Sequence, residues 1–227
     1  MNIAIILIAG NSTRVHCDTP KQFILVNEMP IFVYTTKTFN DCYEIDEIVL
    51  VTRKEDIGFV NEQVKKYSLN KVTAVVEGGS TRQESVYKGL TCKNYSDNDI
   101  VLIHDGARAL VSERIINDNI VACKEYSAAV TAIKNNDSLF VYKDEAIQNY
   151  IPRDDVYRIQ TPQTFRYKII KHAHDKNVAM KATDDSSLVN MYWPIHIVSG
   201  DNNNFKITTD QDILFFEQIV LAKGVNK

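Results

Sequence analysis

The feature that most constrains the fold is the apolar run Ile3–Ile8 near the start of the chain. A short run without polar alternation is typical of a central parallel strand that is buried on both faces. The run ends at Ala9-Gly10, and a polar loop with Arg14 and Lys21 follows. Ligands of open α/β sheets bind at the carboxyl ends of the strands. The loop is therefore either a ligand site or an ordinary connection with solvated basic side chains.

Apolar runs then alternate with helical periodicity. Further strands are predicted at residues 47–51, 72–76, 100–103 and 128–133, and helices at 30–39, 59–67, 81–90 and 112–126. Ser80 or Thr81 is the expected N-cap of the third helix. This order predicts an α/β fold with a mostly parallel twisted sheet, right-handed crossovers and helices on both faces.

The alternation breaks at about residues 135–155. Two β-prone segments, 139–142 and 146–151, flank a charged turn, so we expect a hairpin that leaves the sheet as a β-arm. A two-stranded arm has no core of its own and needs a surface, either a second subunit or its own domain.

Beyond Thr161-Pro162-Gln163 the pattern is again helical. Helices are expected at 166–175, 184–192 and 209–222, with a strand at 195–198. His172 and His174 would lie on an exposed helix, and we expect neither these residues nor His104 to bind a metal. No repeat or low-complexity linker interrupts the chain, so residues 1–227 are predicted to form a single domain.

Composition narrows the functional classes. With 227 residues, 44% hydrophobic and 24% charged, the chain can bury one sizeable core. The net charge of −3 argues against a nucleic-acid or membrane partner. The 4 cysteines lie far apart, which indicates reduced thiols and no zinc module. No segment resembles a signal peptide or spans a bilayer, so we expect a soluble cytoplasmic protein.

Polar groups follow several of the predicted strands or precede helices. A parallel sheet would gather these groups along one rim, where lysines and arginines suit a polyphosphate. Glycines there would let backbone amides approach a ligand, although glycines also occur in plain turns. The residues concerned are Arg14, Lys21, Gly78, Gly79, Ser80, Asp105, Arg108, Thr161 and Lys206.

Six motifs occur in the order and spacing of a known family. They read IAGNSTR with PKQF, GGSTRQESVYKGL, VLIHDGAR, IQTPQTF, TDDSSLV and NNNFKITT. From end to end the chain resembles the cytidylyltransferases that act on polyol phosphates. One branch of that family uses 2-C-methyl-D-erythritol 4-phosphate in the non-mevalonate isoprenoid pathway, and the other uses ribitol 5-phosphate for teichoic acid or capsule synthesis.

The resemblance implies roles for residues in intact motifs. The catalytic cations at the CTP phosphates would be Arg14, Lys21 and Lys206. The CTP pocket would be lined by Ala9, Gly10, Gly79, Ser80 and Ser85. The polyol phosphate would contact Asp105, Arg108 and Thr161, with Ser138 and Arg153 supplied by the arm of a neighbouring subunit.

The resemblance also implies a nucleotidyltransferase-type, Rossmann-like fold and a homodimer. The implied cofactor is Mg²⁺, bound mainly through the CTP phosphates without a dedicated protein site. A phosphate oxygen of the polyol phosphate would attack the α-phosphorus of CTP in line and release pyrophosphate. Preorganised lysines and arginines would stabilise the developing charge, and no nucleophilic side chain is needed.

Several positions depart from the family pattern. Ser12 replaces a usual glycine, Ala109 replaces a proline, and the arm run Asp137-Ser138-Leu139-Phe140 lacks the usual lysine. These changes leave open a homologue that binds CTP without turnover. A dinucleotide-dependent oxidoreductase is less favoured, because Gly10 is followed by Asn11 and the G-x-G-x-x-G pattern is absent.

The motifs disagree about which branch of the family the chain resembles more. The motifs GGSTRQESVYKGL and TDDSSLV are more similar to the methylerythritol branch. PKQF, Tyr157 and FKITT are more similar to the ribitol branch. Because the first two motifs are the longer ones, we predict 2-C-methyl-D-erythritol 4-phosphate as the substrate, with ribitol 5-phosphate as the alternative.

Overall fold

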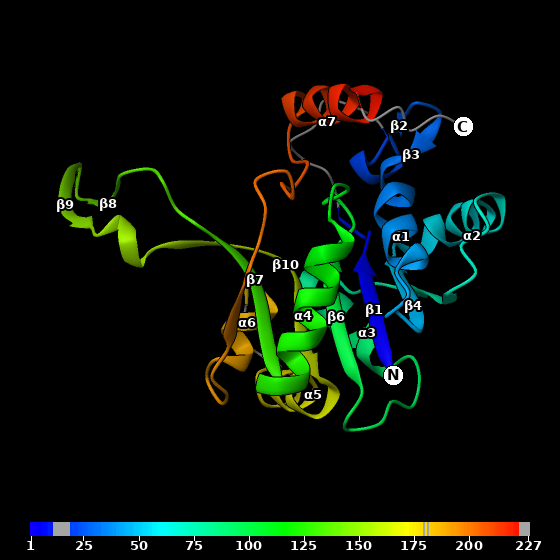
Figure 1. Cartoon of the computed structure of the whole chain (residues 1–227), viewed down its shortest axis with the longest axis horizontal. Helices are drawn as coiled ribbons and strands as arrows, with labels where there is room; N and C mark the ends of the chain where they lie inside the picture. The colour runs from blue at the N-terminus through cyan, green and yellow to red at the C-terminus, as the bar shows by residue number, and fades with distance from the viewer. Residues whose placement is uncertain (11–18, 179, 181, 223–227) are drawn as a thin grey trace.

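The structure is a computed structural model that describes residues 1–10, 19–178, 180 and 182–222. Within these residues the central sheet has seven strands in the order β11-β7-β10-β6-β1-β4-β5 (Figure 1). The strands are β1 (Asn2–Leu7), β4 (Glu47–Thr52), β5 (Val72–Glu77), β6 (Ile100–Asp105), β7 (Ala128–Lys134), β10 (Tyr157–Arg166) and β11 (His196–Ser199). Every neighbouring pair is parallel except those that involve β10. The prediction of a mostly parallel α/β sheet is therefore confirmed.

Helices cover both faces of the sheet (Figure 1). They are α1 (Ile31–Asp41), α2 (Ile57–Lys66), α3 (Arg82–Thr91), α4 (Glu113–Tyr126), α5 (Tyr167–Lys176), α6 (Asp185–Val189) and α7 (Asp210–Ala222). The expected helix at 184–192 is shorter than predicted, and none of the helices in the described ranges combines the length and hydropathy of a membrane span. Short strands β2 (Leu25–Val26) and β3 (Met29–Pro30), which sequence patterns did not indicate, form a separate hairpin.

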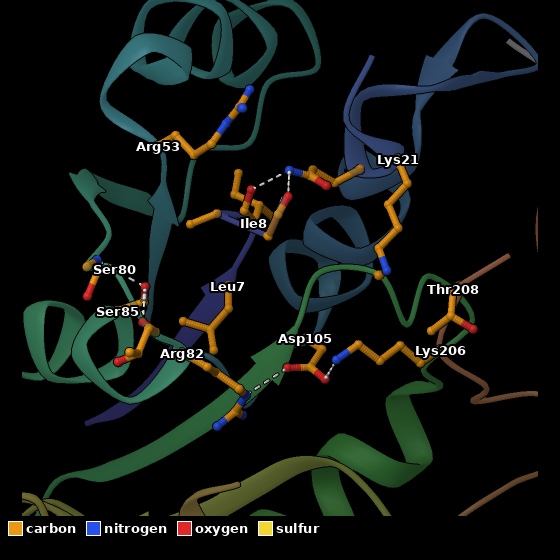
Figure 2. A pocket seen from close by; sticks show the side chains of 16 residues that line it. Leu7, Ile8, Lys21, Arg53, Ser80, Arg82, Ser85, Asp105, Lys206 and Thr208 are labelled. Carbon is orange, nitrogen blue, oxygen red and sulfur yellow. Dashed lines mark hydrogen bonds and ion pairs between the residues drawn. The ribbon is translucent and has the colours of Figure 1, made fainter. Parts of the chain in front are cut away.

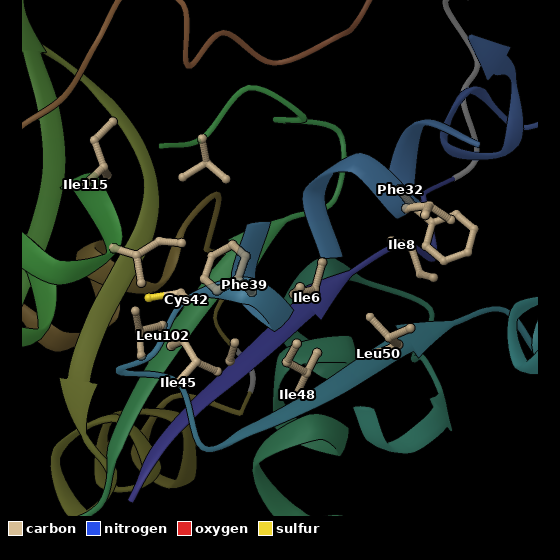
Figure 3. Packing of buried hydrophobic residues seen from close by; sticks show 14 of the residues in the cluster. Ile6, Ile8, Phe32, Phe39, Cys42, Ile45, Ile48, Leu50, Leu102 and Ile115 are labelled. Carbon is tan, nitrogen blue, oxygen red and sulfur yellow. The ribbon is translucent and has the colours of Figure 1, made fainter. Parts of the chain in front are cut away.

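The opening strand shows why its sequence is apolar at every position after Asn2. Ala4 and Ile6 pack with α1, α2 and α4 in the core cluster drawn in Figure 3. Ile3 and Ile5 point to the other face and pack with α3, α5 and α6. Since successive strand residues face opposite sides, burial of both faces requires apolar residues throughout.

Strand β10 is the main element that sequence patterns did not predict. It lies between β6 and β7, antiparallel to both, with an irregular register between Ile159 and Gln163. Its sequence YRIQTPQTFR contains Pro162, and proline normally argues against a central strand. From Gln160 to Phe165 the strand is nevertheless buried, because its polar groups there are paired. For example, the Pro162 carbonyl accepts from Thr131 Oγ1 at 2.8 Å, and Thr164 Oγ1 donates to Asn119 Oδ1 at 3.3 Å.

The predicted arm is present as the hairpin of β8 (Leu139–Lys143) and β9 (Ala146–Ile151). Its turn residues Asp144 and Glu145 have φ values of 54° and 59°, as the favoured two-residue hairpin turn requires. The hairpin extends away from the sheet and helices (Figure 1), and most of its residues are exposed. The arm therefore gains little burial from its own chain.

Candidate active site at the carboxyl rim of the sheet

A cavity of about 420 Å³ opens at the carboxyl ends of the central strands (Figure 2). It is lined by Leu7, Ile8, Ala9, Gly10, Lys21, Gln22, Arg53, Gly79, Ser80, Thr81, Arg82, Ser85, Asp105, Ala107, Lys206 and Thr208. We call this cavity the rim cavity. Most of the residues predicted for the site therefore meet, although they are far apart in the sequence.

The register of the parallel strands explains this convergence. Leu7 at the end of β1 pairs with Val51 of β4 and with Asp105 of β6. The ends of β4 and β5 are also aligned, with Thr52 opposite Glu77. The loops that leave these strands consequently begin at one edge of the sheet, as the rim prediction required.

The loop that connects β5 to α3 is held in a single conformation by its own side chains. Thr81 is the N-cap of α3, since its Oγ1 accepts from the Glu84 N–H at 3.1 Å. The Glu84 carboxylate accepts from Ser80 N at 2.7 Å and from Ser80 Oγ at 2.6 Å. A Cβ at Gly79 would lie 2.2 Å from Glu84 Cβ, so the loop can pack this closely only with glycine.

Ser85 stabilises the same loop from inside. Its Oγ accepts from Gly79 N at 3.0 Å and donates to the Thr81 carbonyl at 2.9 Å. The side chain is 4% exposed and lines the rim cavity. Ser85 thus contacts the cavity while it orders the Gly79 backbone.

Asp105 is the acidic group of the rim cavity and lies between two cations (Figure 2). Lys206 Nζ is 2.8 Å from Asp105 Oδ2, and Arg82 Nε is 3.3 Å from Asp105 Oδ1. Burial by itself raises the pKa of the Asp105 carboxyl, but these two cations lower the pKa by more, so the carboxylate is ionised. The cavity therefore presents a fixed anion among cations.

Lys206 and Lys21 reach the cavity from different parts of the chain (Figure 2). Lys206 is positioned by Ile207, which is buried and donates its N–H to the Ala107 carbonyl at 2.9 Å. Lys21 begins the short 3-10 helix Lys21–Phe23. Gln22 follows it, and its Nε2 donates to the carbonyls of Ile8 and Gly10 at 2.8 and 3.1 Å. The chain is thereby joined back to the end of β1.

Thr161 lies behind Asp105 and does not line the cavity within the described residues. Its buried Oγ1 accepts from the Asp105 N–H at 3.1 Å and is 3.0 Å from His104 Nδ1. Burial lowers the pKa of His104 to about 3, so this imidazole is neutral near pH 7. Thr161 and His104 accordingly support the end of β6.

Arg108 is also set back from the cavity. Its Nη1 donates to the Asn204 carbonyl at 2.7 Å, and its Nη2 donates to the Ile159 carbonyl at 3.5 Å. Burial lowers the pKa of this guanidinium below its ordinary value, and its Nε has no hydrogen-bond partner among the described residues. Arg108 therefore retains an unused donor near the rim.

Besides Thr161 and Arg108, two further predicted site residues in the described part of the chain lie outside the cavity. Ser138 and Arg153 are exposed on the arm, which extends away from the rim (Figure 1). Arg14, together with Ser12, lies outside the described residues.

Arg82 belongs to the motif GGSTRQESVYKGL, but no role was predicted for it from the sequence. Besides Asp105, Arg82 contacts Asp185, with Nη1 2.6 Å from Asp185 Oδ2. Burial by itself lowers the pKa of Arg82, but Asp185 and Asp105 raise it above the ordinary value. Arg53 and Thr208 also line the cavity without having been predicted. The signal in the sequence that could have identified Arg82 was a positive charge at the start of a helix predicted to begin at the rim.

The prediction that His174 lies on an exposed helix was wrong. His172 on α5 is exposed as expected, but His174 is 2% exposed. Its Nε2 lies 3.1 Å from Asp185 Oδ1 because α6 packs against this side of α5. The expected exposed helix is therefore amphipathic, with His174 on its buried face.

The donor set of the rim cavity bears on metal binding. No cluster of three or more His, Cys, Asp or Glu side chains suited to a metal occurs among the described residues. The acidic side chain that lines the cavity, Asp105, already accepts from Arg82 and Lys206. A divalent cation would fit here if most of its oxygen ligands came from a bound polyphosphate.

Known proteins resemble this chain over nearly its whole length. Residues 2–222 match the family model for 2-C-methyl-D-erythritol 4-phosphate cytidylyltransferase. A relative of that name from Clostridium novyi is 43% identical over 224 residues, covering 96% of this chain and 96% of the relative. Another from Clostridium perfringens is 38% identical over 222 residues, covering 96% of this chain and 98% of the relative.

Solved structures agree with the sequence similarity. The 4-diphosphocytidyl-2C-methyl-D-erythritol synthase from Anaerococcus prevotii has a TM-score of 0.85 at 33% identity and covers 97% of this chain and 96% of that one. The 2-C-methyl-D-erythritol 4-phosphate cytidylyltransferase from Thermus thermophilus has a TM-score of 0.77 at 27% identity, covering 96% of this chain and 98% of that one.

Proposed function

The chain belongs to the 2-C-methyl-D-erythritol 4-phosphate cytidylyltransferase family, and from this premise we propose that the rim cavity is its active site. The protein is a nucleotidyltransferase of isoprenoid precursor synthesis. It transfers a cytidylyl group from CTP to 2-C-methyl-D-erythritol 4-phosphate and releases pyrophosphate. The observation that carries the site assignment is the ionised Asp105 held between Lys206 and Arg82 at the end of β6.

The reaction joins two polyanions. A phosphate oxygen of the polyol phosphate attacks the α-phosphorus of CTP, and the bond from that phosphorus to the bridging oxygen of the β-phosphate breaks. Positively charged groups must offset the repulsion of the reactants and the charge on the α-phosphate oxygens. Lys21 and Lys206 line the cavity and supply such charge, and we assign Arg14 to the same task.

The cytidine end of CTP is assigned to the loop between β5 and α3 and to the end of β1. Gly79, Ser80 and Ser85 line this part of the cavity, and Ala9 and Gly10 adjoin it. Because Glu84 and Ser85 already hold the loop, binding needs little further ordering of the backbone. A preformed loop of this kind favours one shape of base over another.

The polyol phosphate is assigned to the side of the cavity near Asp105. Its hydroxyl groups would donate to this carboxylate, and the Arg108 guanidinium, with its unused Nε donor, would bind the phosphate after a small rotation. Thr161 would act indirectly, because its Oγ1 holds the Asp105 backbone. Attack on CTP would take place beside the Asp105–Lys206 ion pair.

Mg²⁺ is part of this proposal as a partner of CTP. It would be held through the triphosphate oxygens and by Asp105, the carboxylate that lines the cavity, and it would neutralise charge on the leaving pyrophosphate. Lys21 and Lys206 would keep their own role beside it, because an ammonium group binds phosphate oxygens by charge and hydrogen bonds and is not a metal ligand.

We further propose a homodimer in which the arm of one subunit serves the site of the other. The arm exposes large apolar side chains, including Tyr142 at 65% and Tyr150 at 70%. An isolated hairpin with such a surface is marginal in water, and a second copy of the chain would cover it. Ser138 and Arg153 would then contact the polyol phosphate bound by the partner.

Steady-state kinetics of pyrophosphate release with CTP test the function. We expect a higher kcat/KM with 2-C-methyl-D-erythritol 4-phosphate than with ribitol 5-phosphate. The substrates differ by a methyl branch and a carbon, which a pocket discriminates by only about 1–3 kcal/mol, so some activity with ribitol 5-phosphate is expected. A preference for ribitol 5-phosphate at equal CTP concentration would contradict the proposed substrate. Absence of pyrophosphate release with both polyol phosphates would contradict the proposed function.

A further inference from the structure

A buried series of ion pairs leads from the wall of the rim cavity into the packing between α3, α5 and α6. Arg82 begins α3 and contacts two carboxylates, Asp105 in the cavity at 3.3 Å and Asp185 behind the cavity wall at 2.6 Å. Asp185 is 1% exposed, and its other oxygen is 3.1 Å from His174 Nε2. Gln163 Oε1 accepts from the Asp185 N–H at 3.0 Å, so both the side chain and the backbone of Asp185 are held.

Asp185 contacts Arg82 without reaching the cavity. The guanidinium is a rigid planar group, so its contact with Asp185 restricts the orientation in which its Nε meets Asp105. The opposite oxygen of Asp105 accepts from Lys206. A rotation of Arg82 would therefore change the charge at Asp105 Oδ1, on the side where we place the polyol phosphate, and would leave Lys206 as the partner of Oδ2.

Stability by itself does not require this arrangement. Buried ion pairs can often be replaced by apolar side chains of similar volume at little cost, because desolvation offsets their attraction. A buried carboxylate that contacts the same arginine as a cavity carboxylate is better explained by orientation.

We propose that Asp185 is a positioning residue for the transfer reaction, because it holds Arg82 from behind and thereby orients Asp105 toward the polyol phosphate. This inference rests on the proposed function of the rim cavity. Asp185 itself touches neither substrate.

Asp185→Asn tests this role, because it keeps the size of the side chain and removes its charge. The matched control is Asp99→Asn. Asp99 is also a buried carboxylate, it accepts from the Met1 amino group at 2.7 Å and from Ser96 N at 2.8 Å, and it directly precedes the opposite end of β6. The measurements are the melting temperature, the dissociation constant of CTP, and kcat and KM for 2-C-methyl-D-erythritol 4-phosphate.

We expect Asp185→Asn to lower kcat/KM for the polyol phosphate by about tenfold or more, since small displacements of positioning groups have effects of this size. Its CTP dissociation constant should stay within about twofold of wild type, because the loop that contacts the cytidine is held by Glu84 and Ser85. Asp99→Asn should lower the melting temperature without changing these kinetic constants. Asp185→Glu, which restores the charge, should recover part of the lost kcat/KM.

Unchanged kinetics in Asp185→Asn, or losses equal to those of Asp99→Asn, would overturn the inference. A loss confined to CTP binding would also overturn it. Should Asp185→Asn fail to fold, Asp185→Glu carries the test, because it shifts the carboxylate by one methylene and should still lower kcat/KM. If both Asp185 variants fail to fold while Asp99→Asn folds, Asp185 is a structural residue and the inference is wrong. Inactivity of the wild type would instead contradict the proposed function.

Discussion

The rim cavity and the β-arm both carry residues assigned to the polyol phosphate, but the two regions differ in burial and in the contacts that hold their side chains. At the rim, Asp105 is 8% exposed and is held by Arg82, Lys206 and Thr161. On the arm, Arg153 is exposed, and β8 and β9 pair only with each other within the described residues. The rim is ordered by contacts within its own chain, whereas the arm is exposed.

The difference follows from how charge is stabilised. A buried charge must have partners, so the residues of the rim hold one another and are oriented before any substrate arrives. An exposed charge on a hairpin is screened by water and contributes little until a partner excludes that water. The rim should therefore account for most of the chemistry, and the arm should act only after assembly.

The largest expected effect is the loss of a rim cation. Lys206→Ala should lower kcat by about 10²–10³-fold, because it removes a preorganised positive charge from the α-phosphate and leaves Asp105 uncompensated on one side. Pyrophosphate release measured at saturating substrates checks this. Lys124→Ala is the control, since Lys124 makes a comparable but exposed ion pair with Glu44 at 3.3 Å. If the kcat of Lys206→Ala were close to that of Lys124→Ala, the rim charge would contribute no more to catalysis than a surface charge.

The next effect tests the arm by complementation. If Arg153 serves the partner's site, Arg153→Ala and Lys21→Ala homodimers should both be poor enzymes. A mixture of the two chains at equal amounts should recover about a quarter of wild-type activity, because half of the dimers are mixed and each mixed dimer has one intact site. Activity is measured after subunit exchange has been shown by mass spectrometry. Exchange without recovery would mean that the arm does not reach the partner's site.

The smallest effect concerns stability and pH. Burial depresses the folded-state pKa of His104 to about 3, below the ordinary 6.5, so the unfolded chain binds a proton that the folded chain does not. Stability is therefore lost as the pH falls below 6.5. From pH 7.5 to pH 5 the free energy of unfolding should fall by about 2 kcal/mol from this group. Asp105 adds no slope there, because its folded pKa is lowered from 3.8 and both values lie below the window.

Urea unfolding at the two pH values measures this effect. His104→Asn should flatten the dependence by that amount, because it removes the group that titrates. An equal slope in His104→Asn and the wild type would show that the rim is less well shielded from water than its burial indicates.

Local sequence patterns predicted the elements that have regular periodicity. Strand β1, apolar from Ile3 onward, and the amphipathic helices were found because burial on one or both faces sets the spacing of apolar residues in the sequence. The arm was found because two β-prone segments flank the turn at Asp144 and Glu145. The meeting of Lys21, Gly79 and Asp105 at one rim followed from the alternation of strands and helices.

Strand β10, the burial of His174 and the partners of Arg82 were decided only by the tertiary structure. Strand β10 is polar and contains Pro162, so its position depends on side chains of β7 and α4 that pair with it. Arg82 and Asp185 are separated by 103 positions, and no periodicity relates residues so far apart. The sequence by itself determined which segments must be buried and where the chain turns, because these are local properties of solvation. Which buried charges meet was determined by packing, because a buried charge selects its partner from whatever the fold brings within hydrogen-bond distance.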